Sequence, residues 1–144
     1  MSEFRVLVCG GRDFGTPAER DQLMRLLDRL FCPVYPADEE GRAGTWVPAP
    51  GLVIIHGDGC GADTCAADWA TSNWVQTREF PADWAAYGRS AGPRRNQRML
   101  DEGKPHLVIA FPGGAGTADM VKRARAARVP VMEVFREESA QVAT

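Results

Sequence analysis

Five short apolar runs divide the chain, and the segments between most of them have the composition and spacing of helices. The runs cover residues 4–9, 52–56, 74–80, 106–111 and 129–135. The segments expected to form helices are 16–31, 62–70, 94–102 and 120–127. Strands that alternate with helices at such short spacings indicate βαβ units with right-handed crossovers. The pattern therefore predicts an α/β fold in which helices cover a mainly parallel sheet of about five strands.

Residues 32–51 do not fit this alternation. They hold four prolines, an acidic run at 38–40 and three glycines. A stretch of this length without periodicity is either an ordered excursion, with a small hairpin around 41–46, or a mobile lid. No domain boundary is visible elsewhere, so residues 1–144 are expected to form one domain whose polar tail, from about residue 136, frays.

Composition and charge exclude several classes of partner. The chain is 44% hydrophobic and 25% charged, with a formal charge of −2. A mildly acidic protein has no global attraction to DNA or to an anionic membrane. The N-terminus lacks the features of a signal peptide, and no apolar run approaches the length of a membrane span. We therefore expect a cytoplasmic protein.

The four cysteines match no zinc motif. Cys9, Cys32, Cys60 and Cys65 are expected to be reduced thiols in a cytoplasmic compartment. Cys60 and Cys65 could join His56 around a metal, but this spacing is unspecific. No metal and no cofactor is expected.

Three glycine-rich turns each follow a predicted strand. They are Gly10-Gly11, the segment Gly57 to Gly61, and Gly113, Gly114 and Gly116 of the motif FPGGAGTADM at 111–120. Glycine lets backbone N–H groups approach a ligand, and the N-terminus of the following helix favours an anion. The carboxyl ends of parallel strands meet at one edge of a sheet, so the turns are expected to converge on one crevice for a phosphate-bearing ligand. The alternative is that each turn needs glycine for its backbone geometry alone.

Charged side chains flank the first two turns. Arg12 could bind a phosphate with two parallel hydrogen bonds, or pair with the neighbouring Asp13. Asp58 and Asp63 flank the second turn. Asp63 is expected to cap the start of a helix. The alternative, for Asp58 or Asp63, is a role in ligand binding in which the carboxylate holds ribose hydroxyls.

A basic cluster begins the helix expected from residue 94. Arg94, Arg95 and Arg98, with Asn96, concentrate positive potential at a helix end that is already positive. Basic residues at this end of a helix oppose the helix dipole and destabilise the helix, and a bound anion would offset that loss. The alternative is a solvated basic face. Just upstream, Trp84 and Tyr87 either stack on a base or pack their loop against the core.

Acid–base chemistry has few candidates. Asp119 is the carboxylate of the third glycine-rich motif and is expected in the first turn of the helix that follows. There it could bind hydroxyls, orient an arginine or act as a base. His56 and His106 are the two histidines. No Ser–His–Asp set is indicated, and His106, at the start of a strand, is interpreted as structural.

Four ordered motifs together resemble the SLOG superfamily, and within it the YspA or cpYpsA-related branch. They are GGRDF at 10–14, HGDGCGAD at 56–63, PADW..YG..AGPRRN at 81–96 and FPGGAGTADM at 111–120. The resemblance covers nearly the whole chain except residues 32–51, which look like an insertion, and the polar tail. It implies a Rossmann-like three-layer sandwich. The superfamily includes Lonely Guy (LOG) phosphoribohydrolases, the DNA-processing protein DprA and domains that sense signals derived from NAD or ADP-ribose. The resemblance thus implies a pocket for a nucleotide or nucleotide-derived ligand.

The resemblance to LOG enzymes is incomplete where catalysis would occur. Those enzymes carry PGGxGTxxE, with a catalytic Glu three positions after Thr and an arginine on the preceding helix. Arg95 falls in register with that arginine, but Met120 occupies the Glu position. Asp119 lies one residue earlier, and a helical step of about 100° directs it elsewhere. The sequence therefore favours a binding or sensing module. The alternative is a LOG-like phosphoribohydrolase that uses Arg95 and Asp119.

The expected ligand-binding residues come from all these segments. They are Gly10, Gly11, Arg12, Asp13, Gly57, Asp58, Gly61, Asp63, Arg94, Arg95, Asn96, Pro112, Gly113, Gly114, Gly116, Thr117 and Asp119. The net charge argues against binding of single-stranded DNA in the manner of DprA. Related proteins often dimerise through helices that flank the pocket. The Ala-rich segment 118–127 is a candidate for such an interface, or it packs closely on its own sheet.

Overall fold

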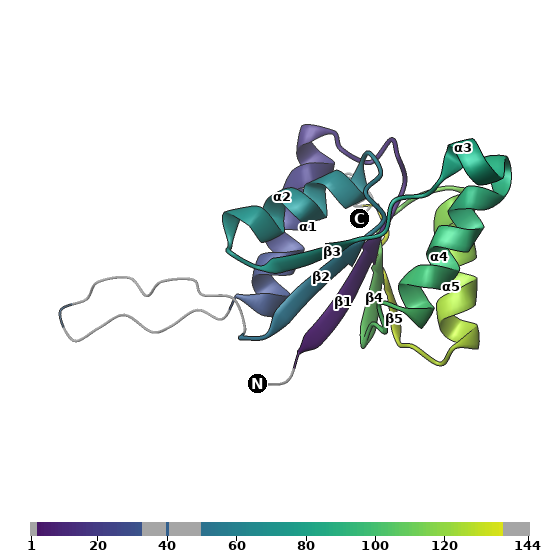
Figure 1. Cartoon of the computed structure of the whole chain (residues 1–144). Helices are drawn as coiled ribbons and strands as arrows, with labels where there is room; N and C mark the ends of the chain where they lie inside the picture. Colours follow the sequence, from purple (N-terminus) through teal and green to yellow (C-terminus); the bar gives the residue numbers. More distant parts are fainter. Residues whose placement is uncertain (1–2, 33–39, 41–49, 137–144) are drawn as a thin grey trace.

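The computed structural model describes residues 3–32, 40 and 50–136 (Figure 1). Most of the expected insertion, including the predicted hairpin around 41–46, and nearly all of the expected tail lie outside the described residues. Within the described part, the strands form one parallel sheet in the order β3-β2-β1-β4-β5. Their bounds are β1 Phe4–Cys9, β2 Leu52–His56, β3 Gln76–Glu79, β4 Leu107–Ala110 and β5 Val131–Glu133. The predicted parallel sheet is therefore confirmed.

Helices cover both faces of this sheet. α1 Pro17–Phe31 and α2 Ala62–Ser72 lie on one face, and α4 Ala91–Asp101 and α5 Ala115–Ala126 lie on the other (Figure 1). Alternate residues of β1 supply the two apolar layers: Val6 packs toward α1 and α2, and Leu7 packs toward α4 and α5. The Rossmann-like three-layer sandwich is confirmed.

The first helix begins where the sequence predicts. The Thr16 hydroxyl accepts a hydrogen bond from the Glu19 N–H at 3.2 Å, and the Glu19 carboxylate accepts one from the Thr16 N–H at 3.1 Å. This reciprocal capping, together with Pro17 at the first helical position, satisfies donors that the first turn leaves unpaired.

The helix expected from residue 94 begins three residues earlier, at Ala91. The segment before it, expected to be a loop, contains the short helix α3 Trp84–Tyr87 and a 3₁₀ turn at Gly88–Ser90. The sequence analysis places Pro93 before the helix, whereas proline is tolerated in a first helical turn and lies there in the structure. Arg95 and Arg98 therefore lie beyond the first turn. Their unfavourable interaction with the positive end of the helix dipole is smaller than predicted.

The last helix also begins early, five residues before Met120. Gly114 caps it without a side-chain hydrogen bond, and Gly116 lies inside its first turn. Because glycine is a poor helix former, a prediction from composition misses this first turn of α5. As a consequence Asp119 lies in the second turn of α5 and not in the first. Met120, Val121 and Ala124 face the sheet, whereas Ala118, Ala126 and Ala127 are exposed, so packing on its own sheet accounts for only part of the Ala-rich segment.

The three glycine-rich turns pack directly against one another at the carboxyl edge of the sheet. The Gly11 N–H donates to the Pro112 carbonyl at 2.9 Å, and the Gly11 carbonyl accepts from the Ala62 N–H at 3.4 Å. A Cβ on Gly113 would approach the Gly11 nitrogen to 2.6 Å, and one on Gly61 would overlap the Gly11 carbonyl oxygen. Gly11, Gly61 and Gly113 are thus required for the close approach of three loops.

The junction of the three loops at Gly11, Gly61 and Gly113 predicts unequal losses of stability for two glycine substitutions, one inside the junction and one outside it. Gly61 (φ +74°, ψ −124°) and Gly88 (φ +54°, ψ −130°) share a conformation that other residues disfavour. A Cβ on Gly88 has no neighbour within 4 Å. We expect Gly88→Ala to lower the free energy of unfolding by about 1–3 kcal/mol through strain alone, and Gly61→Ala to lower it by roughly 2 kcal/mol more through overlap. Urea unfolding measures both variants, and equal losses would contradict the packing described for the junction.

Candidate functional site: a cleft at the carboxyl edge of the sheet

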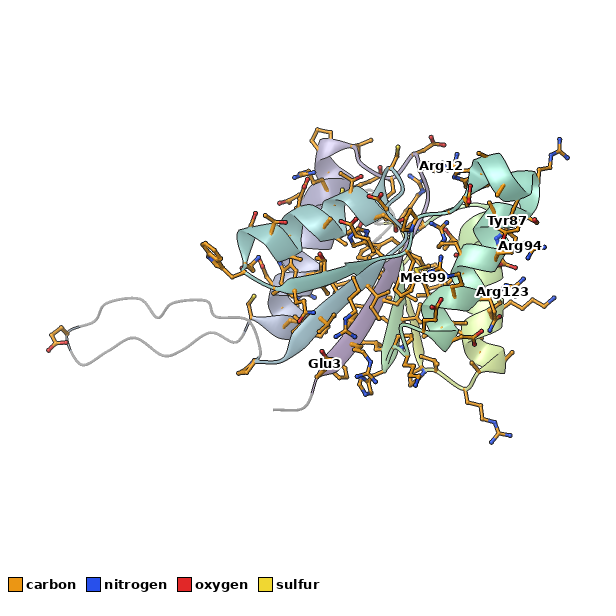
Figure 2. The ribbon with its side chains drawn as sticks, viewed as in Figure 1. Glu3, Arg12, Tyr87, Arg94, Met99 and Arg123 are labelled. Carbon is orange, nitrogen blue, oxygen red and sulfur yellow. The ribbon has the colours of Figure 1, made fainter. Side chains whose placement is uncertain are left out.

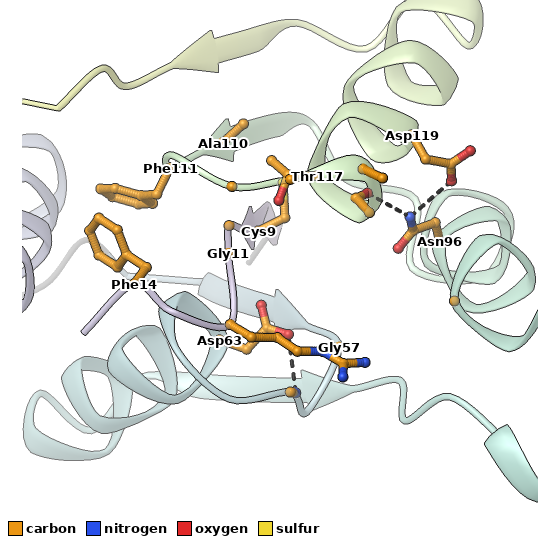
Figure 3. A pocket seen from close by; sticks show the side chains of 18 of the residues that line it. Cys9, Gly11, Phe14, Gly57, Asp63, Asn96, Ala110, Phe111, Thr117 and Asp119 are labelled. Carbon is orange, nitrogen blue, oxygen red and sulfur yellow. Dashed lines mark hydrogen bonds between the residues drawn. The ribbon is translucent and has the colours of Figure 1, made fainter. Parts of the chain in front are cut away.

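The three turns form one wall of an open cleft of about 1740 Å³. The other walls come from the segment between β3 and α4, from the inner side of α4 and α5, and from the end of β5 and the residues after it, 133–136 (Figure 3). This volume exceeds the range of about 300–1,000 Å³ that is usual for small-molecule pockets. The cleft therefore has room for a ligand of mononucleotide size or larger.

Most of the expected ligand-binding residues line this cleft, and two do not. Gly61 is used in the junction of the turns. Arg94 points elsewhere: its guanidinium carbon lies 4.4 Å from the centre of the Tyr87 ring, and its Nε donates to the Ser90 hydroxyl at 3.2 Å (Figure 2). One helical step separates Arg94 from Arg95, which does line the cleft.

Gly114 and Gly116 differ from the glycines of the junction. A Cβ at either position would meet no atom within 4 Å, and both residues are exposed on the wall of the cleft. Neither has a positive φ between +20° and +160°. The packing of the protein itself therefore does not require glycine here, whereas a ligand that approaches the backbone would require it.

Arg95 is anchored on the floor of the cleft. Its guanidinium donates to the Gly57 carbonyl at 2.7 Å and to the Asn96 side-chain oxygen at 3.1 Å. Burial lowers the pKa of Arg95, and the nearby carboxylate of Asp63 opposes this shift. The arginine thereby ties the second glycine-rich turn to α4 and contributes positive potential to the cleft.

Asp63 is a half-buried carboxylate that faces this arginine. Burial raises the pKa of Asp63, although a hydrogen bond from the Gly59 N–H, at 3.1 Å, and the charge of Arg95 act in the opposite direction. Asp63 forms no ion pair within the part of the chain that the structure describes. A carboxylate with a raised pKa in a cleft is typical of functional sites.

The buried thiol of Cys9, beside Asp63, is poorly suited to act as a nucleophile. Burial, and to a smaller extent the charge of Asp63, raises the pKa of Cys9 to about 12. The thiolate that nucleophilic chemistry needs is therefore scarce at neutral pH.

Asp119 belongs to a hydrogen-bonded network between α4 and α5. One carboxylate oxygen accepts from the buried Asn96 amide at 3.0 Å and from Arg123 Nε at 2.8 Å (Figure 3). Burial alone would raise the pKa of Asp119, but the bonds from Arg123 and Asn96 outweigh it and lower the pKa overall. The Asn96 amide also donates to the Gly116 carbonyl at 3.2 Å. The network thus fixes the first turn of α5 and keeps Asp119 ionised.

Met120 is fully buried in the apolar layer formed with α4 and the sheet. The position at which LOG enzymes carry the catalytic Glu therefore supplies no carboxylate to this cleft.

The two histidines lie at opposite ends of the strands, His56 at the carboxyl end of β2 and His106 just before the amino end of β4. His106 is remote from the cleft, where its Nδ1 accepts from the Arg5 N–H at 3.0 Å and its ring stacks on Phe4. His56 is buried, and its Nδ1 accepts from the Asp58 N–H at 3.1 Å. It thereby supports Asp58 at φ +56° in the second turn. The sequence did not reveal this role, because a histidine that ends an apolar strand carries no local signal of its hydrogen-bond partner.

Other lining residues were not among the sequence predictions. They include Arg89, Arg136 and the apolar residues Val134 and Phe135. Arg136 pairs with Glu19 at 2.7 Å, so the segment after β5 is attached to the start of α1. No local pattern indicates this ion pair, because it joins residues that are far apart in the chain.

Within residues 3–32, 40 and 50–136, no group of three or more His, Cys, Asp or Glu side chains could hold a metal ion. The same residues contain no helix that is both long and apolar enough to cross a membrane.

Comparisons with known proteins identify a family and a relative that this chain resembles. Residues 46–87 match the model of the YspA, cpYpsA-related SLOG family. The Gene 61 protein of Mycobacterium phage D29 is 36% identical over 92 residues, with 57% of this chain and 70% of that protein covered. No solved structure matches significantly. The family match spans β2, α2, β3 and α3, and thus the second glycine-rich turn and Trp84.

The raised pKa of Asp63 predicts a pH-dependent gain in stability for Asp63→Asn. Ionised Asp63 destabilises the folded state at neutral pH, because folding raises its pKa above the ordinary value of 3.8. The substitution should therefore raise the urea midpoint at pH 7. This gain should shrink as the pH falls through the raised folded pKa and disappear below about 3.8. A pH-independent effect at Asp63 would contradict the assignment.

Proposed function

Because the chain belongs to the YspA, cpYpsA-related SLOG family, we propose that it binds a nucleotide or nucleotide-derived ligand in this cleft, as a sensor or sequestering module. The ligand is a nucleoside monophosphate or a compound related to NAD or ADP-ribose, and the protein does not cleave it.

The observation that carries the proposal is the open space at Gly114 and Gly116. These glycines begin α5, where unpaired N–H groups and the positive end of the helix dipole favour a phosphate. Glycine is a poorer helix former than alanine, by up to about 1 kcal/mol in a helix interior. Gly116 carries this cost with no packing contact to offset it. Close approach of a phosphate to the backbone supplies the reason.

The remaining charges complement such a ligand. Arg95 provides positive potential on the floor, and Asp63 provides acceptors for ribose hydroxyls. A carboxylate is otherwise an unfavourable neighbour for a phosphate, so a hydroxyl-bearing group accounts best for Asp63.

Binding without turnover is favoured by the state of two side chains. Met120 is buried, and the carboxylate of Asp119 holds Asn96 and Arg123. The alternative function is a LOG-like phosphoribohydrolase that cleaves an N-glycosidic bond. One observation favours it: Arg95 and Asp119 both line the cleft.

Gly116→Ala tests the phosphate site. The added methyl group has room in the free protein and improves helix propensity, so stability should be unchanged or higher by up to about 1 kcal/mol. Binding of AMP or ADP-ribose, measured by isothermal titration calorimetry, should weaken at least about tenfold, which corresponds to the loss of one charge-assisted hydrogen bond. Lys122→Ala, on the same helix but outside the cleft lining, is the control and should bind as the wild type does. Unchanged affinity in Gly116→Ala would refute this phosphate site.

Turnover is tested separately. Wild-type protein incubated with AMP, NAD and ADP-ribose should release no free base on chromatography. Release of base that is lost in Asp119→Asn would establish the hydrolase and contradict the binding module.

A further inference from the structure

Trp84 presents a half-exposed indole ring to the cleft, from the segment between β3 and α4. Its side chain is 47% exposed, although α3 carries it directly beside α4. A Cβ on Gly92 would lie 3.3 Å from the edge of the ring, so the indole is seated edge-on against α4. Trp84 is therefore held in place while much of its surface remains open to a ligand.

A cation covers this ring. The guanidinium carbon of Arg12 lies 5.1 Å from the ring centre, and Arg12 comes from the glycine-rich turn after β1 (Figure 2). Apart from this contact, Arg12 has no hydrogen bond or ion pair within the described residues. Among the described residues, the contact with the Trp84 ring is therefore what holds the Arg12 guanidinium in position.

We infer that Trp84 is the stacking platform for the aromatic base of the ligand, and that the base replaces the Arg12 guanidinium on the ring. A cation–π contact at an exposed site is weaker than the stacking of a nucleobase on an aromatic side chain, so the exchange is favourable. The released guanidinium then lies beside the cleft as an unpaired donor for an oxyanion of the same ligand. The ligand class is one that joins a planar heterocycle to a phosphate.

Tyr87 supplies an internal comparison. It lies on the same short helix, is 49% exposed and also carries an arginine, Arg94, over its ring. Tyr87 does not line the cleft. The two aromatic–arginine pairs therefore have similar chemistry but differ in their access to a ligand.

This inference rests on the proposed nucleotide-binding function, and it is tested with AMP and ribose 5-phosphate, which share the phosphate and differ in the base. Wild-type protein should bind AMP more tightly than ribose 5-phosphate. Trp84→Leu keeps apolar bulk against Gly92 but removes the aromatic face. It should weaken AMP binding by about ten- to a hundredfold, the range measured when a stacking side chain is removed, and change ribose 5-phosphate binding less than about twofold. Trp84→Phe should restore most of the loss, and Tyr87→Ala should bind both compounds as the wild type does.

The outcomes separate this inference from the proposed function. If wild-type protein binds both compounds equally, or Trp84→Leu weakens both to the same degree, the base does not stack on Trp84, while the phosphate site stands. If Trp84→Phe binds AMP as weakly as Trp84→Leu, aromatic stacking is likewise refuted. If wild-type protein binds neither of these compounds, nor NAD or ADP-ribose, the proposed function and the stacking platform both fail.

Discussion

The site depends on the close approach of three loops at Gly11. The backbone of this residue is hydrogen-bonded to Pro112 on one side and to Ala62 on the other. Side chains larger than hydrogen at Gly11, Gly61 or Gly113 would separate the loops that end β1, β2 and β4. Because these loops are the wall of the cleft, the packing of backbone against backbone determines where every ligand-facing group lies.

The glycines of the site therefore divide into two classes with different physical reasons. Gly11 and Gly113 allow the loops to touch, whereas Gly114 and Gly116 have empty space beside them. The first class explains the architecture of the cleft. The second class has no structural reason in the free protein, and the proposed binding of a ligand would provide one.

The sequence predicts the architecture well because its strongest signals are local. Short apolar runs mark β1 and β2 with their observed bounds, and Thr16-Pro17 marks the start of α1. The starts of α4 and α5 are missed, since Pro93 and Gly116 resemble loop residues when read without their tertiary context. The error has consequences for function, because it places Asp119 in the wrong turn.

The chemistry of individual side chains is harder to predict, because it is decided by partners distant in sequence. Arg94 and Arg95 are adjacent and alike, yet one packs on Tyr87 and the other lies on the floor of the cleft. The low pKa of Asp119 depends on Asn96 and Arg123, and the raised pKa of Asp63 depends on burial. Local pattern identifies these residues as candidates but does not assign their roles.

The central claim is that a phosphate-bearing ligand binds intact at the start of α5. Titration of ¹⁵N-labelled protein with AMP, followed by NMR, tests it directly. The amide signals of Gly114, Gly116 and Thr117 should shift most strongly, while the ribose anomeric proton of AMP keeps the signal of an uncleaved nucleotide. Shifts confined to residues outside the cleft, or the appearance of free adenine, would contradict it.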